Sequence, residues 1–188
     1  MAKLYFRHGT MGSAKTLNLL AVAHSYQLQQ KKILILKPAL DKRFGVELVK
    51  SRSGLEKPAD LLVSEATRLS KKELEGIQCI LVDEAQFLLP DFVDHLRDIA
   101  RDDNIPVICY GLRTDFSTHL FPGSKRLLEL CDTIEEVKNT CHYCNRKAIF
   151  NMRLVNGRGA KEGPQVLLGA EETYVPVCPS CYHERLAT

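Results

Sequence analysis

Residues 8–16, with the sequence HGTMGSAKT, nearly match the pattern of a phosphate-binding loop. The pattern is G-x-x-x-x-G-K-[ST], and the backbone N–H groups of such a loop surround phosphate oxygens. Gly9, Lys15 and Thr16 fit the pattern, whereas Ala14 stands where the second glycine belongs. The lysine can reach the terminal phosphates of a nucleotide, and the threonine hydroxyl can bind Mg²⁺. The stretch therefore predicts a nucleotide site, with a chance match as the alternative.

The alanine at position 14 is compatible with such a loop if its backbone is already turning into a right-handed helix. A Cβ atom costs nothing in that conformation, whereas glycine is needed at a positive φ or where a phosphate touches Cα. We expect Ala14 to be helical and Gly12 to supply flexibility two residues earlier. On this hypothesis Ala14→Gly leaves the catalytic efficiency nearly unchanged.

Two acids, Asp83 and Glu84, follow an apolar run in the stretch CILVDEAQF, residues 79–87. An aspartate at the end of a strand is where a phosphate-loop protein holds Mg²⁺, and a second carboxylate there can accept a proton or orient a water. Without the loop, the pair would be an ordinary solvated turn. Glu84 suits a kinase or a hydrolase equally well. The predicted nucleotide-binding residues are Gly9, Thr10, Met11, Gly12, Ser13, Ala14, Lys15, Thr16, Asp83, Glu84, Ala85 and Gln86.

Four of the seven cysteines form two C-x₂-C pairs, which residues 145–177 separate. Four thiolates suit a closed, tetrahedral structural Zn²⁺ site, although four unrelated thiols are the alternative. His142 and His183 lie beside the pairs, and we expect them at the surface because four cysteines complete the site. The predicted zinc ligands are Cys141, Cys144, Cys178 and Cys181.

Most of residues 1–136 alternate short apolar runs with longer amphipathic ones. This alternation predicts a parallel sheet with helices on both faces. Residues 38–60 interrupt it with polar and turn-forming residues, and we expect them to include a mobile loop. The expected strands are residues 3–9, 32–37, 79–87, 105–112 and 133–137, and the expected helices are 15–30, 89–103 and 123–131.

The C-terminal part differs in character, with paired cysteines and many turn residues, among them the expected loop 156–164. We predict two domains, a P-loop α/β nucleotide-binding domain at residues 1–138 and a zinc-ribbon-like domain at residues 139–188. A unit this small has little core, so a bound metal would stabilise it.

The overall composition is that of an ordinary globular protein, with 188 residues, 45% hydrophobic, 26% charged and a net charge of +3. Like charges form no long run, so we expect no nucleic-acid partner. Neither a membrane-spanning apolar run nor a signal-peptide hydrophobic region is present, so we expect a cytoplasmic protein without membrane contact. Disulfides are rare there, and we expect Cys79, Cys109 and Cys131 to behave as small hydrophobes.

In this order the motifs resemble those of the type II thymidine kinase family, which bacteria, animals and poxvirus-like viruses share. The likeness covers nearly the whole chain and includes DEAQF (83–87), YGLRTDF (110–116), the paired cysteines and TYVPVC (173–178). The last string is similar to the family's lasso, a loop that closes over the nucleoside. The resemblance implies a P-loop α/β fold with a small zinc-binding lasso domain.

The resemblance also implies a reaction, namely transfer of the γ-phosphoryl group of ATP to the 5′-hydroxyl of thymidine, and of deoxyuridine. That reaction belongs to deoxynucleotide salvage for DNA synthesis. ATP, Mg²⁺ and a structural Zn²⁺ are the implied cofactors. The family is typically a homotetramer that is inhibited by dTTP, the final product of its pathway.

Individual roles follow from the same resemblance. Glu84 matches the general base, Lys15 matches a phosphate-binding residue, and Thr16 and Asp83 match the residues that hold Mg²⁺. Arg43, in LDKRF, matches an arginine that reaches the reacting phosphates. The implied nucleoside-binding residues are Phe87, Phe116 and Phe121, which line the base pocket, and Tyr174, whose lasso binds thymine mainly through backbone groups.

Two other functions stay open. A nucleic-acid-dependent or regulatory P-loop ATPase would explain the loop, Asp83 and Glu84 but not TYVPVC, and it predicts hydrolysis stimulated by DNA or RNA. A nucleotide-binding or assembly module without turnover is supported by Ala14 alone. Asn151 lies near the position where the family tunes access to the 5-position of the base, so it is a candidate for setting the preference between thymidine and deoxyuridine.

Overall fold

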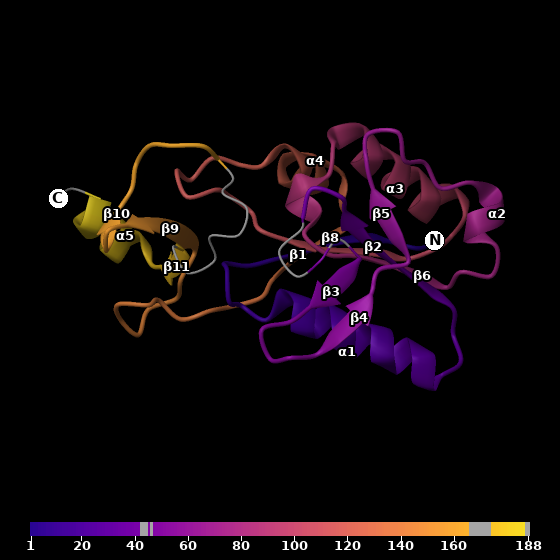
Figure 1. Cartoon of the computed structure of the whole chain (residues 1–188). Coiled ribbons are helices and arrows are strands. Elements are labelled where there is room, and N and C mark those ends of the chain that lie inside the picture. Colours follow the sequence, from indigo (N-terminus) through magenta and orange to yellow (C-terminus); the bar gives the residue numbers. More distant parts are fainter. Residues whose placement is uncertain (42–44, 46, 166–173, 187–188) are drawn as a thin grey trace.

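The computed structural model describes residues 1–41, 45, 47–165 and 174–186. Within these residues, a six-stranded parallel sheet has the strand order β5-β2-β6-β7-β1-β8 (Figure 1). The predicted α/β class and parallel sheet are therefore confirmed. The strands are β1 (Leu4–His8), β2 (Ile33–Pro38), β5 (Leu61–Val63), β6 (Cys79–Val82), β7 (Val107–Gly111) and β8 (Thr133–Glu136).

Helices cover both faces of this sheet, as the alternating pattern predicts (Figure 1). Helix α1 (Lys15–Leu28) packs on one face. The short α2 (Lys71–Leu74), α3 (Pro90–Asp102) and α4 (Pro122–Leu130) pack on the other. Within the part of the chain that the structure describes, no helix is long and apolar enough to cross a membrane.

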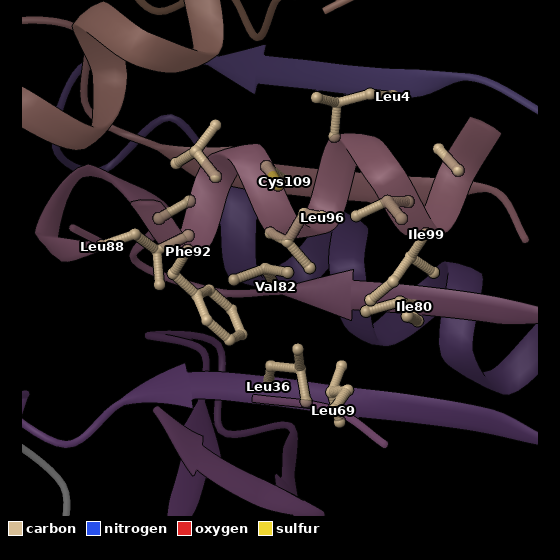
Figure 2. Close-up of a cluster of buried hydrophobic side chains, with 14 of the residues drawn as sticks. Leu4, Leu36, Leu69, Ile80, Val82, Leu88, Phe92, Leu96, Ile99 and Cys109 are labelled. Atoms are coloured by element: carbon tan, nitrogen blue, oxygen red, sulfur yellow. The ribbon is translucent and has the colours of Figure 1, made fainter. Parts of the chain in front are cut away.

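The core explains why the central strand β6 is a continuous apolar run. On β6, Ile80 and Val82 point toward α3, whose Leu96 and Ile99 lie against them (Figure 2), while Leu81 points toward α1. Strand β6 therefore buries both of its faces, so it shows no polar alternation. Each buried aliphatic side chain stabilises the fold by about 1.5–3 kcal/mol. As predicted, Cys79 and Cys109 are buried, and Cys131 is partly buried.

Residues 38–60 contain more regular structure than their composition indicates. A two-stranded antiparallel ribbon forms from β3 (Leu48–Lys50) and β4 (Glu56–Pro58). The Lys50–Glu56 ion pair, at 2.8 Å, joins the two strands. Val49, the middle residue of β3, is almost fully buried. The composition did not indicate these strands, because three-residue strands are too short to show a period.

Several predicted elements end earlier than expected. Helix α1 stops at Leu28, and β6 stops at Val82, before the acids. Residues Ala85–Phe87 form a short 3₁₀ helix, η1, so the acidic pair lies in a turn between strand and helix.

The C-terminal part forms a smaller sheet of its own. Within the described residues its strand order is β10-β9-β11, from β9 (Phe150–Val155), β10 (Arg158–Gly159) and β11 (Tyr174–Val177), and α5 (Pro179–Leu186) follows. All of its pairings are antiparallel. Met152 and Val177 are fully buried in a separate small core with two of the paired cysteines.

Candidate active site

The predicted phosphate loop connects β1 to the first residue of α1. Lys15 is buried, and its Nζ donates hydrogen bonds to the Thr10 carbonyl at 2.7 Å and the Ser13 hydroxyl at 3.4 Å. Gly9 has no room for a side chain, because a Cβ there would lie 2.5 Å from the Ser13 hydroxyl. The lysine ammonium thus lies against the loop at the N-terminus of α1, and the N-terminus of a helix favours an anion.

Ala14 does not take the expected right-handed conformation. Its φ of 64° and ψ of 26° lie in the left-handed region, and Gly12 also has a positive φ of 75°. The loop must reverse direction immediately before α1, and it does so at these two residues. A left-handed backbone costs an L-residue roughly 1–2 kcal/mol. The expectation that a Cβ costs nothing at position 14 is wrong, since the motif has its second glycine where the backbone is left-handed.

We therefore expect Ala14→Gly to stabilise the protein by about 1 kcal/mol, because glycine adopts this conformation without steric cost. Thermal unfolding of the two proteins measures the difference. Ala21→Gly is the matched control, since Ala21 is exposed on α1 and the change should destabilise by about 1 kcal/mol. Equal destabilisation by both substitutions would contradict a left-handed Ala14.

Asp83, the first acid after β6, contacts Thr16 in the first turn of α1. The Thr16 hydroxyl lies 3.2 Å from both carboxylate oxygens of Asp83, although β7 separates β1 from β6 in the sheet. Asp83 is 5% exposed. A hydroxyl and a carboxylate are hard oxygen donors of the kind that Mg²⁺ prefers next to nucleotide phosphates. These two residues thus fit the predicted metal site.

Glu84 is held in an uncommon conformation beside Asp83. Its φ of 49° is left-handed, and such backbone strain of about 1–3 kcal/mol is concentrated at functional sites. The Gln86 side chain donates a hydrogen bond to the Glu84 carboxylate at 2.6 Å and accepts one from the Leu112 N–H at 2.9 Å. The structure thus places Gln86 behind Glu84, where it orients the carboxylate.

Two glycines make room for this turn. A Cβ at Gly111 would lie 2.7 Å from the Gln86 amide oxygen, and one at Gly123 would lie 2.6 Å from the Ala85 carbonyl. Larger residues at either position would push the turn, and Glu84 with it, out of place.

We expect Gln86→Leu to lower the turnover of the site by about 10- to 100-fold, since a hydrogen bond to a charged group contributes about 1.5–3 kcal/mol. Steady-state kinetics would measure it, with the exposed Gln78→Leu as the control. An unchanged kcat would show that Glu84 needs no support from Gln86.

A cavity of about 260 Å³ lies between the phosphate loop, the acidic turn and the β3–β4 ribbon. Sequence reasoning missed the contribution of the ribbon, whose turn Ser51–Ser53 brings Arg52 to the cavity. Lys37 supports the ribbon through a hydrogen bond to the Leu48 carbonyl at 2.9 Å, and it also forms an ion pair with Asp41 at 3.3 Å. The predicted nucleotide residues that line the cavity are Met11, Gly12, Ala14, Lys15, Thr16, Asp83 and Glu84.

His8 ends β1 directly before the loop. Burial lowers the pKa of its imidazole, and the positive charge of Arg113 lowers it further. Both effects favour the neutral form of this ring beside the phosphate loop.

The predicted aromatic residues lie in two groups. Phe87 and Phe121 pack edge to face, with ring centroids 5.7 Å apart. Phe116 lies against the C-terminal part instead, where the Arg153 guanidinium stacks 3.9 Å from its ring centroid and the Tyr182 hydroxyl donates to its carbonyl at 2.6 Å. Tyr174 begins β11 and pairs with Arg153 across the sheet.

Arg153 was missed by sequence reasoning and is 3% exposed. It donates hydrogen bonds to the carbonyls of Glu162 and Pro164, and a Cβ on Gly163 would clash with its guanidinium. Its buried Nε has no hydrogen-bond partner among the described residues. One side chain thus joins Phe116 to the segment 162–165. No local pattern marks this role, because the contacts are made across the fold.

Some predicted residues cannot be placed. Arg43 lies outside the described residues, as do residues 166–173 of the segment that leads into TYVPVC. Their predicted roles therefore stay predictions.

The four paired cysteines come together. All four Sγ atoms lie within 4.8 Å of one another, and Cys144 lies 3.7 Å from Cys178 and 3.8 Å from Cys181. A tetrahedral zinc with Zn–S bonds of about 2.3 Å needs sulfurs about 3.8 Å apart. The cluster therefore fits Zn²⁺ in kind and in size. His142 and His183 are exposed and outside the cluster, as expected.

The comparisons with known proteins agree with the motifs. A family model described as thymidine kinase matches residues 2–182. The chain is 44% identical over 184 residues to a thymidine kinase of Chromobacterium violaceum, covering 97% of this chain and 99% of that protein. It is 43% identical over 188 residues to a thymidine kinase of Lactobacillus acidophilus, covering 95% and 94%.

Solved structures give a looser likeness. The Pif1 helicase from Candida albicans matches with a TM-score of 0.45 and 10% identity, covering 73% of this chain and 36% of that chain. A similarity this low carries no argument about function.

Proposed function

The chain belongs to the thymidine kinase family, and on that premise we propose roles for the residues of its site. The protein is an enzyme of nucleotide salvage that phosphorylates thymidine with ATP. One observation carries the proposed roles, namely that Thr16, Asp83 and Glu84 meet Lys15 at one cavity. Phosphoryl transfer depends on positioning and charge neutralisation, and this set of groups supplies both.

We propose that Lys15 and the loop N–H groups bind the β- and γ-phosphates of ATP, while Thr16 and Asp83 hold Mg²⁺. When bound, the metal neutralises charge on the phosphate oxygens. Glu84 accepts the proton of the 5′-hydroxyl of thymidine as that oxygen attacks the γ-phosphorus, and the products are thymidine monophosphate and ADP. Gln86 supports the role of Glu84 by fixing its carboxylate. Arg43 is proposed from the family resemblance as a further phosphate ligand.

We propose that Phe87, Phe116 and Phe121 line the base pocket and that the segment around Tyr174 closes over the nucleoside. Aromatic faces suit a pyrimidine ring, and a closing segment excludes water, so the phosphoryl group goes to the sugar. The contact of Arg153 with both Phe116 and residues 162–164 supports this role. Deoxyuridine is proposed as a second substrate.

The domain division, the zinc site, the oligomeric state, the inhibitor and the cellular location are also proposals. We propose that residues 1–138 and 139–188 form two units and that the four cysteines bind a structural Zn²⁺. The small separate core around Met152 supports the division. A homotetramer, inhibition by dTTP and a cytoplasmic location rest on the family resemblance.

The direct test supplies ATP and Mg²⁺ with thymidine, deoxyuridine, deoxycytidine or deoxyadenosine. We expect thymidine monophosphate and ADP in equal amounts. ATP hydrolysis that DNA or RNA stimulates, without a nucleoside monophosphate, would contradict the kinase. Bound ATP without turnover would support a nucleotide-binding module instead.

We expect Arg153→Met to raise the KM for thymidine by about 10-fold or more, since it removes a buried cation–π contact and two hydrogen bonds. The KM for ATP should change little. Initial rates at varied thymidine and ATP measure both constants, with the exposed Arg158→Met as the control. Equal effects on both constants would indicate a general loss of folding.

A further inference from the structure

Two asparagines from the C-terminal part contact the phosphate loop. The Asn151 side chain, on β9, accepts a hydrogen bond from the Met11 N–H at 2.8 Å. The Asn139 side chain donates to the Met11 carbonyl and to the Thr10 hydroxyl, both at 3.1 Å. Both backbone polar groups of Met11 are thus bound by side chains from the far end of the sequence.

Hydrogen bonds to Met11 can stabilise the phosphate loop, because the loop contains left-handed residues close to Met11. Met11 directly precedes Gly12, and Ala14 follows two residues later, both left-handed. Ala14 has a Cβ and favours a right-handed backbone, so the loop tends to leave the conformation that directs its N–H groups at phosphate. Hydrogen bonds that fix Met11 oppose that change, because they restrain the backbone of the loop three residues before Ala14.

The two asparagines are themselves fixed by the zinc-binding part. The Asn139 carbonyl accepts a hydrogen bond from the Ala148 N–H at 2.9 Å, and its side-chain oxygen accepts one from the Thr140 N–H at 2.9 Å. Asn151 is 4% exposed in the strand that pairs with β11. The supports therefore come from the two ends of the segment that carries the first cysteine pair.

We propose that Asn139 and Asn151 are positioning residues that hold the phosphate loop in its strained, ATP-binding conformation. The C-terminal part thereby sets the affinity for ATP, in addition to its proposed role over the nucleoside. The inference rests on the proposed role of the loop in binding ATP.

The test measures ATP·Mg²⁺ binding by calorimetry without nucleoside, so it does not depend on phosphorylation of thymidine. Asn139→Ala should weaken ATP binding by about 5- to 30-fold, since it removes two hydrogen bonds. The KM for thymidine should stay within about twofold of the native value. Of the two proposed subsites, for ATP and for the nucleoside, the described contacts of Asn139 reach only the ATP-binding loop. Asn145→Ala, an exposed asparagine of the same segment, should leave ATP binding unchanged.

A second substitution separates support of the loop from a general structural role. In the Asn139→Ala background, Ala14→Gly should restore most of the lost ATP affinity, because glycine needs no support in the left-handed conformation. A protein that merely folds poorly without Asn139 would not be rescued in this way. Unchanged ATP binding in Asn139→Ala, or no recovery in the double variant, would overturn the proposal.

Asn151→Leu tests the second contact, which it removes at similar side-chain volume. It should weaken ATP binding in the same direction, with the zinc content of the protein unchanged. Native ATP affinity in this variant would assign the support to Asn139 alone and overturn the role of Asn151. Strong ATP binding without thymidine phosphorylation in the native chain would contradict the proposed function but not this inference.

Discussion

Replacing Glu84 with glutamine should lower kcat for thymidine phosphorylation by about 10²- to 10⁴-fold, the usual contribution of a general base. Glutamine keeps the size of the side chain but cannot take the proton of the 5′-hydroxyl. The Glu84 carboxylate lies on the left-handed turn after β6 and accepts a hydrogen bond from the Gln86 amide at 2.6 Å. Rates of thymidine monophosphate formation at saturating ATP measure the effect.

The exposed Glu65→Gln is the matched control and should have native kinetics. ATP binding by the Glu84→Gln protein should be close to native, because Lys15, Thr16 and Asp83 are intact. A similar kcat in the two proteins would place the base elsewhere. An equal loss of ATP affinity and kcat would mean that Glu84 acts through the metal.

Replacing Cys178 with serine should abolish zinc binding and lower the rate of thymidine phosphorylation by at least about 100-fold. Metal binding in small zinc domains contributes about 10–16 kcal/mol of folding free energy, which the small core around Met152 and Val177 cannot replace. Cys178 directly follows β11, so its loss also frees the strand that begins with Tyr174. Metal analysis, expected at one zinc per native chain, and activity measured on the same samples test the prediction.

Cys131→Ser serves as the control, since Cys131 lies outside the cluster and should leave zinc content and activity near native. Native protein that is isolated with well under one zinc per chain would count against the four-cysteine site. A fully active Cys178→Ser protein would show that the metal is not needed to hold the C-terminal strands.

The buried strands and the long helices could be predicted because the residue pattern that favours each of them lies within the element itself. Residues 33–36 and 79–82 are apolar throughout since helices cover both faces of the sheet, and α1 and α3 are long enough to show a period. The β3–β4 ribbon could not be predicted, because its strands are held by pairing and by Lys37, not by a pattern of their own.

Some residues of the candidate site could likewise be predicted from the sequence, and others could not. The phosphate loop, Asp83 and the cysteine pairs have fixed spacings that their chemistry requires, so the sequence shows them directly. The left-handed backbone of Ala14 was not predicted, because alanine favours a right-handed backbone and only the glycine of the motif marks this conformation. Asn139, Asn151 and Arg153 act on residues far away in the sequence, and such contacts exist only once the chain is folded.

The order of strands also determines when the nucleotide site can form during synthesis. Strand β1 is made first, but its neighbours in the sheet are β7 and β8, so Leu4 must wait for Val107 and Tyr5 for Thr133. Strands β2, β5 and β6 need only each other, within residues 33–82, to begin their half of the sheet. Closing the longer loop costs more chain entropy and comes later. We therefore expect the half of the sheet without the phosphate loop to begin assembling first during synthesis, and we expect ATP to stabilise the protein only after β7 has emerged.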